Sequence, residues 1–493
     1  MSLSSYLSLI QVVSPFDSSD SSQTSVLELC LLMLTFALSF WCWKASIYLD
    51  PVKSSSHSEN IFESSKTLLK DLQPSELSFQ LLLFILPIFL VFSNLGLVFI
   101  VNSFLAGYAL GLLNSKPKYV KSSFPNVSSS QKFPSKEHNG YLSVYRGTMM
   151  ILTCFSILAV DFPIFPKRFA KTELYGQSLM DVGVGSFVFS SGIVGYRFWL
   201  KRDITPQKSY LVSVYKAFKS SFTVFLIGFL RLILTKLLNY QVSVTEYGVH
   251  WNFFFTLGFL DIFVHLIIQY SDNYAQFILP LLAVYQTALS FFDLENYILH
   301  APRVNLLSQN KEGVFSFIGY LIIYFAGLRI GQEILKPVSK NTKNSKIKTL
   351  FFIWSSLLAA FVFSTRVLDM KISRRVVNLP YIILSVWLNT FVLWLFLVFD
   401  YIILHASFPY PYVPPSYHNK VPLILKAVNF NGLFIFLLAN ILTGLVNLAI
   451  REFTSFKSAM SMPPSLSFFI LATYLSILLY ISLSLHKNNI RIR

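Results

Sequence analysis

Residues that could carry acid–base chemistry gather where one long hydrophobic segment ends, at Asp161. The chain continues DFPIFPKRFAK, so Pro163 stops a helix just after the carboxylate, and Lys167, Arg168 and Lys171 follow. The negative end of a helix and partial burial both disfavour an ionised carboxylate, which suits Asp161 to accept a proton. Acyl transfer to a hydroxyl needs such a base, with a cation to stabilise the oxyanion. Basic side chains that simply reach lipid headgroups are an equally good interpretation of the spacing.

A second group of polar and aromatic residues lies in the segment TEYGVHWNFF. Glu246 and His250 are four residues apart, which places them on one face if a helix begins early. Two such ligands are too few for zinc, and no HExxH motif or cysteine pair completes a site, so we predict no metal. The alternative is an aromatic belt at the membrane interface, formed by Tyr247 and Trp251 with the polar groups as caps. The candidate substrate-binding residues of this kind are Glu246, His250, Trp251, Asn252 and His300.

Two adjacent arginines, Arg374 and Arg375, lie in the segment ISRRVVNLPY. Guanidinium groups bind phosphate oxygens in pairs, so this dipeptide is a candidate contact for a phosphoinositide or for coenzyme A. Anchoring at the membrane interface is the alternative. Asp261 and His265, four apart within an apolar run, are predicted to satisfy each other. The sequence has no P-loop, dinucleotide fingerprint or GxSxG elbow.

The elements that must position these residues are membrane helices. The chain has 493 residues, of which 54% are apolar and 13% charged, against roughly a quarter charged in an ordinary soluble domain. Apolar runs of the ~20 residues needed to cross a bilayer recur along its length. The net charge of +17 does not predict nucleic-acid binding, because the basic residues are scattered through the short connections. The three cysteines lie in apolar segments and predict neither disulfides nor a zinc site.

The sequence therefore predicts an all-α, polytopic bundle of about 13 transmembrane helices. Residues 1–25 form a polar N-terminus without the charged start of a cleavable signal, residues 26–485 form one transmembrane domain, and residues 486–493 form a tail. The stretch 78–113 is interpreted as two short helices. The predicted spans are 26–49, 78–96, 97–113, 147–162, 179–199, 219–237, 251–270, 275–293, 314–331, 349–367, 380–404, 431–450 and 466–485.

The basic residues predict the orientation of these spans. Alternate connections, counted with the ends of the flanking spans, carry 27 of the 40 lysines and arginines. Because cytosolic loops are enriched in these residues, that set is predicted to be cytosolic. It includes the loop 114–146 and the C-terminus, so the N-terminus is lumenal. The sequon at Asn126 lies on the cytosolic side and is expected to carry no glycan.

Several motifs together resemble one family. They are YRGTMMILTCFSILAVDFPIFPKRFAKTELYGQSLMDVGVGSFVFSSG, TEYGVHWNFF, NKEGVFSFIGY, SRRVVNLPY and NGLFIFLLANILTGLVNLAI, between residues 145 and 450. In them the chain resembles the fungal GPI-anchored wall transfer proteins, the inositol acyltransferases of glycosylphosphatidylinositol biosynthesis.

The resemblance implies a multi-pass enzyme of the endoplasmic reticulum membrane. Such an enzyme transfers a fatty acyl group, typically palmitoyl, from acyl-CoA to the inositol of glucosaminyl-phosphatidylinositol and needs no cofactor beyond acyl-CoA as co-substrate. It also implies that Asp161 and Lys171 are the catalytic pair. Lys167 and Arg168, basic residues beside that pair, are candidate substrate contacts from their chemistry. The alternative class is a polytopic lipid transporter or scramblase, which typically shows paired repeats and broken helices at the midplane. In this sequence the polar motifs are instead concentrated at one end of the helix bundle, which argues against the transporter alternative.

Overall fold

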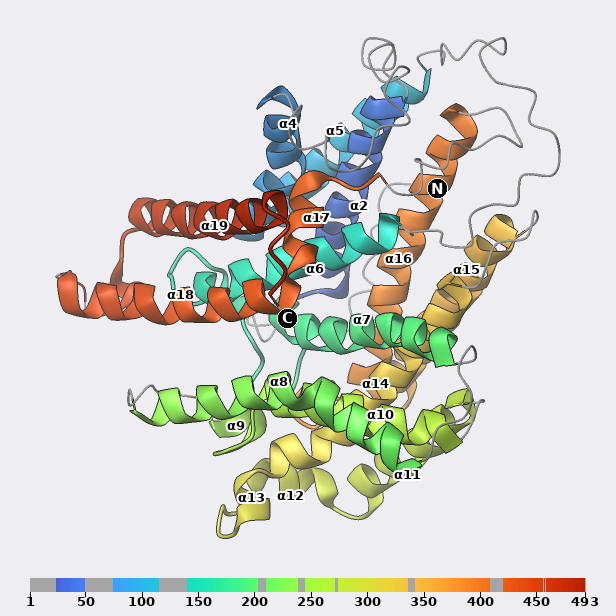
Figure 1. The fold of residues 1–493 in the computed structure, drawn as a ribbon, viewed down its shortest axis with the longest axis vertical. Coiled ribbons are helices and arrows are strands. Elements are labelled where there is room, and N and C mark those ends of the chain that lie inside the picture. Colours follow the sequence, from blue (N-terminus) through green and yellow to red (C-terminus); the bar gives the residue numbers. More distant parts are fainter. Residues whose placement is uncertain are drawn as a thin grey trace. The chain divides into compact units, whose positions relative to one another are not determined.

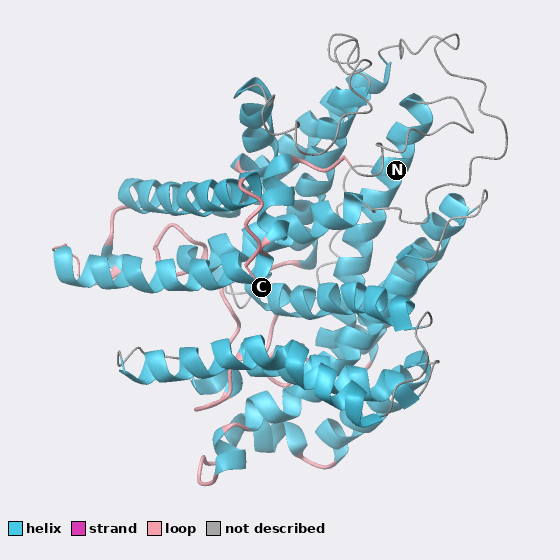
Figure 2. Ribbon diagram, viewed as in Figure 1, coloured by secondary structure: helices cyan, strands magenta, loops and turns pink. Residues whose placement is uncertain are grey.

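The computed structural model describes residues 24–48, 74–114, 140–202, 210–237, 244–270, 274–335, 342–407, 420–454, 456 and 458–492. Every regular element in these ranges is a helix, as Figure 1 and Figure 2 show. In a bilayer the backbone must satisfy its own hydrogen bonds, and a helix does so within one segment. The predicted fold class, a helical polytopic membrane protein, is confirmed. The predicted polar N-terminus and the Asn126 loop lie outside the described residues.

The described residues divide into two compact units. The first unit takes those between 171 and 336 and between 348 and 390, and the second unit takes the others. The first contains α7 (Leu179–Arg202), α8 (Tyr210–Leu237), α9 (Val244–Tyr247), α10 (Phe253–Tyr270), η4 (Tyr274–Phe277), α11 (Ile278–Phe291), α12 (Leu294–His300), α13 (Leu306–Gln309) and α14 (Lys311–Leu335). The second contains α2 (Val26–Tyr48), α4 (Pro74–Phe84), η1 (Leu86–Phe92), α5 (Leu95–Asn114), α6 (Gly140–Ala159), η3 (Lys167–Phe169), α17 (Leu423–Phe430), α18 (Gly432–Phe453), η7 (Ala459–Ser461) and α19 (Pro464–Lys487). Helices α15 (Thr342–Val362, continued by the π-turn η5, Phe363–Val367) and α16 (Leu379–Ser407) contribute to both.

Among the described residues, 11 helices are long and apolar enough to cross a membrane, and the bent pair α11 and α12 makes up to 12. This pair bends by 68° beside Asp293, whose φ of 55° is in the left-handed region and breaks the helix. Helix α10 occupies the predicted span 251–270, but its apolar part, Phe253–Ile267, is shorter than the ~20 residues of a full span. The predicted number of about 13 therefore differs from the structure at these two places.

The stretch 78–113 forms separate helices, as predicted. Helix α4 gives way to the 3-10 helix η1, which has Pro87 in its first turn, and the chain then turns at Ser93. Asn94 begins the next helix, because its Oδ1 accepts a hydrogen bond from the Leu97 amide at 3.0 Å. A capping asparagine inside an apolar run is thus what divides the two helices.

Glycines allow α7 and α14 to pack closely in the first unit. Gly327 and Gly331, four apart on α14, lie against the backbone of Phe189 and Ile193 on α7, and a Cβ on Gly331 would lie 2.9 Å from the Ile193 carbonyl oxygen. Small residues at this spacing let two membrane helices approach until their backbones touch. The two helices run parallel, because residues four apart on one meet residues four apart on the other.

Most residues of helix α2, in the second unit, are buried. It packs on α5, where the Asn102 amide donates to the Leu31 carbonyl at 3.0 Å. Lys44 on α2 forms a buried ion pair with Asp400 on the last part of α16. Because a charge in a membrane interior is costly without its counter-ion, this pair specifies which helices become neighbours.

Candidate functional site

Asp161 lies in a turn directly after α6. The turn continues the helix by hydrogen bonds from the amides of Asp161 and Phe162 to the carbonyls of Leu158 and Ala159, both 3.1 Å long. Pro163 then prevents the helix from going further. The carboxylate is half-buried and accepts a hydrogen bond at 2.7 Å from the Asn447 side-chain amide on α18. The predicted base is therefore at a helix end, as expected from the sequence, and is held there by a distant helix.

The basic residues after Asp161 have different surroundings. Arg168 stays within the second unit, where its guanidinium binds Glu28 on α2 at 2.9 Å and the Ser93 carbonyl at 3.2 Å. It also stacks on Phe169, with 4.6 Å from its Cζ to the ring centre. Lys167 is exposed. Of these two predicted substrate contacts, Arg168 is engaged in holding η3 against α2, and Lys167 points to the surface.

Lys171 belongs to the first unit, where it forms an ion pair with Glu246 on α9. Its Nζ is 2.8 and 2.9 Å from the two carboxylate oxygens, and the two side chains keep 35% and 24% of their surface exposed. Burial raises the pKa of Glu246, but Lys171 and then Arg374 outweigh it, and the pKa lies below its ordinary value. Glu246 is therefore ionised at neutral pH. The sequence predicted both residues as functional candidates without predicting that they meet.

Glu246 and His250 do not share a helix face, contrary to the prediction. Helix α9 ends at Tyr247 because the next residue, Gly248, has a φ of +124°, a backbone conformation that residues with a side chain rarely adopt. Glycine is also required there because a Cβ would lie 2.6 Å from the Asn310 Cα. The amides of His250 and Trp251 instead donate to the Asn310 side-chain oxygen at 2.8 and 2.9 Å. The next helix begins only at Phe253.

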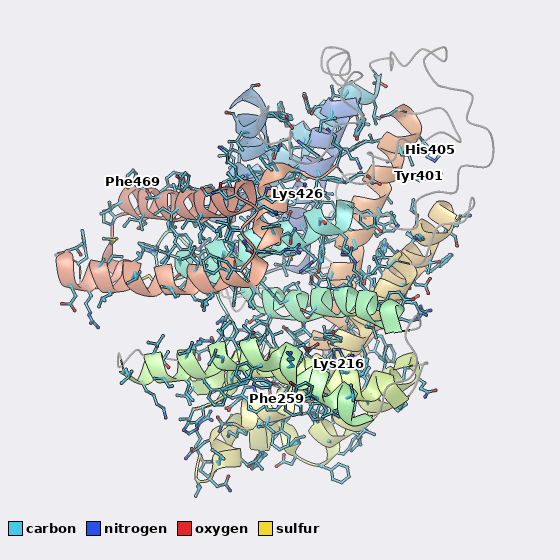
Figure 3. All side chains as sticks on the ribbon, in the orientation of Figure 1. Lys216, Phe259, Tyr401, His405, Lys426 and Phe469 are labelled. Atoms are coloured by element: carbon cyan, nitrogen blue, oxygen red, sulfur yellow. The ribbon has the colours of Figure 1, made fainter. Side chains whose placement is uncertain are left out.

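Trp251 and Asn252 start α10 and attach it to its neighbours. The indole N–H of Trp251 donates to the Thr256 hydroxyl at 2.9 Å, and the ring stacks on Phe259, labelled in Figure 3, with centroids 5.3 Å apart. The Asn252 Oδ1 accepts from the Phe254 amide at 3.0 Å, and its Nδ2 donates to the Gly228 carbonyl on α8 at 3.0 Å. These contacts give both residues a cap and packing role, the alternative that the sequence left open.

Arg374 and Arg375 are buried in the first unit rather than displayed to a ligand. The Arg374 Nε binds the Asp181 carboxylate of α7 at 2.7 Å, and the exposed fractions of the two side chains are only 4% and 1%. Burial works against the charge of Arg374, yet Asp181 and Glu246 raise its pKa above the ordinary value. Arg375 binds Glu312 on α14 at 2.8 Å. The dipeptide therefore joins the loop before α16 to two other helices.

Buried carboxylates, which the sequence did not single out, are the centres of these contacts. Asp181 also accepts from the hydroxyls of Thr172 and Ser178, at 2.9 and 2.8 Å. Glu312 accepts a second guanidinium, that of Arg303, at 2.5 Å. The Ser178 hydroxyl in turn accepts from the Asp181 amide at 3.1 Å. Ser178 and Asp181, three apart before an apolar run, form a helix-start signature, and α7 begins at Leu179, where the predicted span 179–199 begins.

His300 is the last residue of α12 and is exposed. The C-terminal end of α12 is capped by Lys311. The Lys311 Nζ donates to the carbonyls of Tyr297 and Ala301 at 3.0 and 2.5 Å. Among the described residues, no group of three or more His, Cys, Asp and Glu side chains could hold a metal ion. That the protein works without a metal stays a prediction.

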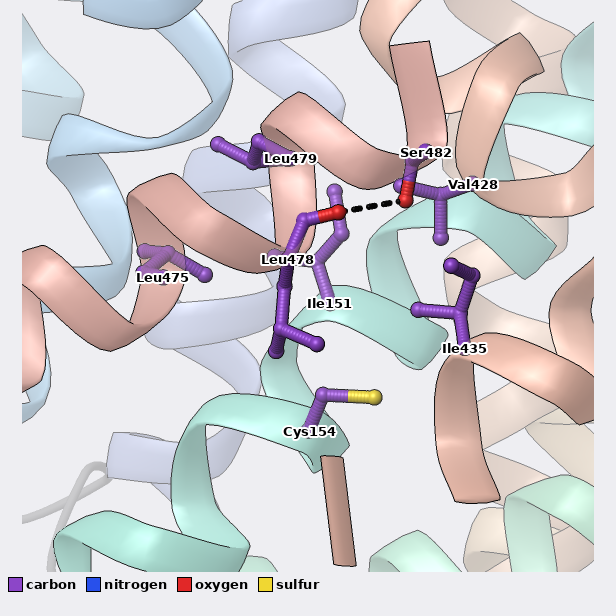
Figure 4. Close-up of a pocket in the computed structure, with 8 residues that line it drawn as sticks. All are labelled: Ile151, Cys154, Val428, Ile435, Leu475, Leu478, Leu479 and Ser482. Carbon is purple, nitrogen blue, oxygen red and sulfur yellow. Dashed lines mark hydrogen bonds between the residues drawn. The ribbon is translucent and has the colours of Figure 1, made fainter. Parts of the chain in front are cut away.

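A small apolar cavity in the second unit is too small to hold a substrate. Figure 4 shows it between α6, α17, α18 and α19, with Cys154 and Ser482 among its lining residues and the Ser482 hydroxyl bonded to the Leu478 carbonyl of its own helix. Its volume is about 10 Å³, at the lower limit for a single water molecule. It is a packing defect and carries no chemistry.

In comparisons with known proteins, the chain is similar to members of one protein family. The family model described as GWT1 matches residues 17–485. A GPI-anchored wall transfer protein 1 from Yarrowia lipolytica is 41% identical over 398 residues, which cover 77% of this chain and 79% of that protein. Proteins of the same name from Saccharomyces cerevisiae and Schizosaccharomyces pombe are 38% and 37% identical, over 72% and 71% of this chain and 75% and 73% of theirs.

Proposed function

Since the chain belongs to the GWT1 family of GPI-anchored wall transfer proteins, and therefore to GPI-anchor biosynthesis, we propose that it is an acyl-CoA-dependent inositol acyltransferase. The donor is a long-chain acyl-CoA, with palmitoyl-CoA as the expected species. The acceptor is an inositol hydroxyl of glucosaminyl-phosphatidylinositol. The observation that carries the proposal is Asp161, a half-buried carboxylate held at the end of a membrane helix.

In the proposed reaction Asp161 is the general base. Its carboxylate takes the proton of the inositol hydroxyl while the hydroxyl oxygen attacks the thioester carbonyl, forming a C–O bond. The tetrahedral intermediate then breaks its C–S bond. The leaving sulfur of coenzyme A takes the proton back from Asp161, so the products are an inositol ester and free coenzyme A, and the carboxylate is regenerated.

Lys171 is proposed to stabilise the oxyanion of that intermediate. A preorganised cation is most effective where negative charge develops, because it need not reorganise during the reaction. Its bidentate contact with Glu246, at 2.8 and 2.9 Å, supports a preorganised ammonium group. Glu246 then acts as a positioning residue for Lys171. The ten residues from Asp161 to Lys171 form one continuous segment that carries both groups.

The remaining sequence predictions become part of the same proposal. We propose a location in the endoplasmic reticulum membrane, with a lumenal N-terminus and a cytosolic C-terminus, as the sequence predicts. Lys167, whose side chain is exposed, is the proposed contact for a substrate phosphate, whereas Arg374 and Arg375 already bind buried carboxylates. His250 and His300 remain candidates for contact with the acceptor.

The decisive experiment is transfer by the purified full-length protein in detergent or proteoliposomes. Radiolabelled palmitoyl-CoA and glucosaminyl-phosphatidylinositol are supplied together, and the labelled lipid and the released thiol are both measured. We expect one thiol for each acylated lipid, and no product when the acceptor is omitted. Release of the thiol without a labelled lipid would make the protein a thioesterase. Movement of the lipid between leaflets without acylation would favour the scramblase alternative.

A further inference from the structure

We propose that Asn447 is a positioning residue for Asp161, whose carboxylate it holds in the orientation that receives the hydroxyl proton. This inference rests on the proposed acyltransferase function. Asn447 lies on α18, 286 residues beyond Asp161 along the chain, and its Nδ2 is 2.7 Å from the Asp161 Oδ2. Both residues belong to the second unit. No spacing in the sequence links them.

The contact of Asn447 differs from those of Asn440 and Asn389, two other asparagines within membrane helices. Asn440, two turns earlier on α18, donates to the Phe436 carbonyl of its own helix at 2.8 Å. Asn389 on α16 likewise donates to the Ser385 carbonyl four residues back, at 2.7 Å. A self-contained bond of this kind is the usual way for a polar side chain to be satisfied in lipid. Asn447 instead donates to an acid on another part of the chain.

The packing of α6 and α18 fixes this contact in register. Tyr474 on α19 donates its hydroxyl to the Cys154 carbonyl of α6 at 2.8 Å and lies 3.3 Å from the Ala439 carbonyl of α18. Asp161 follows Cys154 by seven residues, and Asn447 follows Ala439 by eight. At 1.5 Å per residue both distances are about two helical turns. Tyr474 therefore fixes the positions of α6 and α18 along their axes relative to each other, so that Asp161 and Asn447 come into contact.

The helices α6 and α18 also run in the same direction. A Cβ on Gly432, at the start of α18, would lie 3.2 Å from the Met150 Cε of α6, and the contacts at Asp161 and Asn447 lie further along both helices. The fourth and twelfth predicted spans likewise share a direction. Asn447 and Asp161 are therefore expected on the same, lumenal, side of the membrane.

The hydrogen bond from Asn447 is able to position the carboxylate. The carboxyl group of an aspartate rotates about its Cβ–Cγ bond, and a hydrogen bond to one oxygen restrains that rotation. The Asn447 amide is itself neutral, so its own effect on the proton affinity of the carboxylate is weaker than that of a cation would be. Asn447 thus acts on the reaction through Asp161 and does not itself touch substrate.

The test compares variants of the full-length protein in the acyl-transfer assay. Asn447→Leu keeps the branching of the side chain at Cγ and removes the donor, whereas Asn447→Gln keeps an amide donor. We expect the Leu variant to lose about tenfold in kcat with the KM for both substrates within about twofold, and the Gln variant to recover a substantial part. Asn440→Leu is the matched control in the same helix and should keep a near wild-type kcat.

A double-mutant cycle with Asp161→Asn separates positioning from a general packing effect. If Asn447 acts through Asp161, Asn447→Leu should not reduce the residual rate of Asp161→Asn any further. An additive loss, or wild-type kcat in Asn447→Leu, overturns the assignment of Asn447 and leaves the proposed function intact. Absence of transfer by the wild-type protein overturns both. If the Leu variant does not purify as a single species, the kcat of Asn447→Ala is compared with that of Asn447→Gln, and the same outcomes apply.

Discussion

Two groups of charged residues at helix ends, one around Asp161 and one around Arg374 and Arg375, look alike in sequence but differ in their partners. Arg374 is closed off, since its side chain is buried against that of Asp181. Asp161 is half-buried, and a neutral amide from α18 donates to its carboxylate. A buried ion pair fixes two helices relative to each other, and a carboxylate that keeps part of its surface exposed remains accessible to a hydroxyl group. Exposure, more than residue type, thus distinguishes the proposed base Asp161 from the buried Arg374.

Removing the base should have the largest effect. Asp161→Asn keeps the shape of the side chain and abolishes proton acceptance, so we expect turnover to fall by about 100-fold or more while acyl-CoA binding changes little. The measurements are single-turnover acyl transfer and equilibrium binding of a non-hydrolysable acyl-CoA analogue. A correctly folded Asp161→Asn protein with near wild-type turnover would transfer the role of base to His250 or His300.

Breaking a buried pair should affect folding and leave the chemistry intact. Glu312→Gln leaves Arg303 and Arg375 without their carboxylate, and we expect a loss of about 3 kcal/mol in the free energy of unfolding. The protein that remains folded should transfer acyl groups at a similar rate per molecule. Thermal unfolding and specific activity of the purified monodisperse fraction test this. A large rise in the KM for either substrate with unchanged stability would restore the phosphate-binding interpretation of Arg375.

Glu246 should show a smaller, intermediate effect, because it acts through Lys171. Glu246→Gln weakens the hold on the ammonium group, and we expect about a tenfold loss of kcat. The pKa of Glu246 is below its ordinary value, so the charged pair is complete above that value and is lost only as pH falls through the lower pKa. The wild-type rate should therefore show no titration of Glu246 near neutral pH.

The matched control for this variant is Glu173→Gln, since Glu173 is an exposed acid two residues from Lys171. It should keep wild-type kcat. Equal losses in the Glu246 and Glu173 variants would show that overall charge matters and that the contact with Lys171 does not.

Much of the fold followed from hydropathy. Apolar runs with a polar or glycine-containing connection predict helices in a bilayer because no other single segment satisfies its backbone there. The division of the stretch 78–113 into separate helices and the helix end before Pro163 were both predicted from the sequence. The count of spans was less accurate, because α10 is short and because the break between α11 and α12 depends on the left-handed backbone of Asp293.

The sequence by itself determined the class of the molecule, the positions of most helices and the candidate residues Asp161 and Lys171, because these follow from hydropathy, proline and local charge. Only the tertiary structure decided which partner each residue has. Asn447 reaches Asp161 from 286 residues away, Lys171 meets Glu246, and Arg374 turns inward to Asp181. Such pairings depend on how helices distant in the chain pack and in what register, and a local pattern of residues does not encode that register.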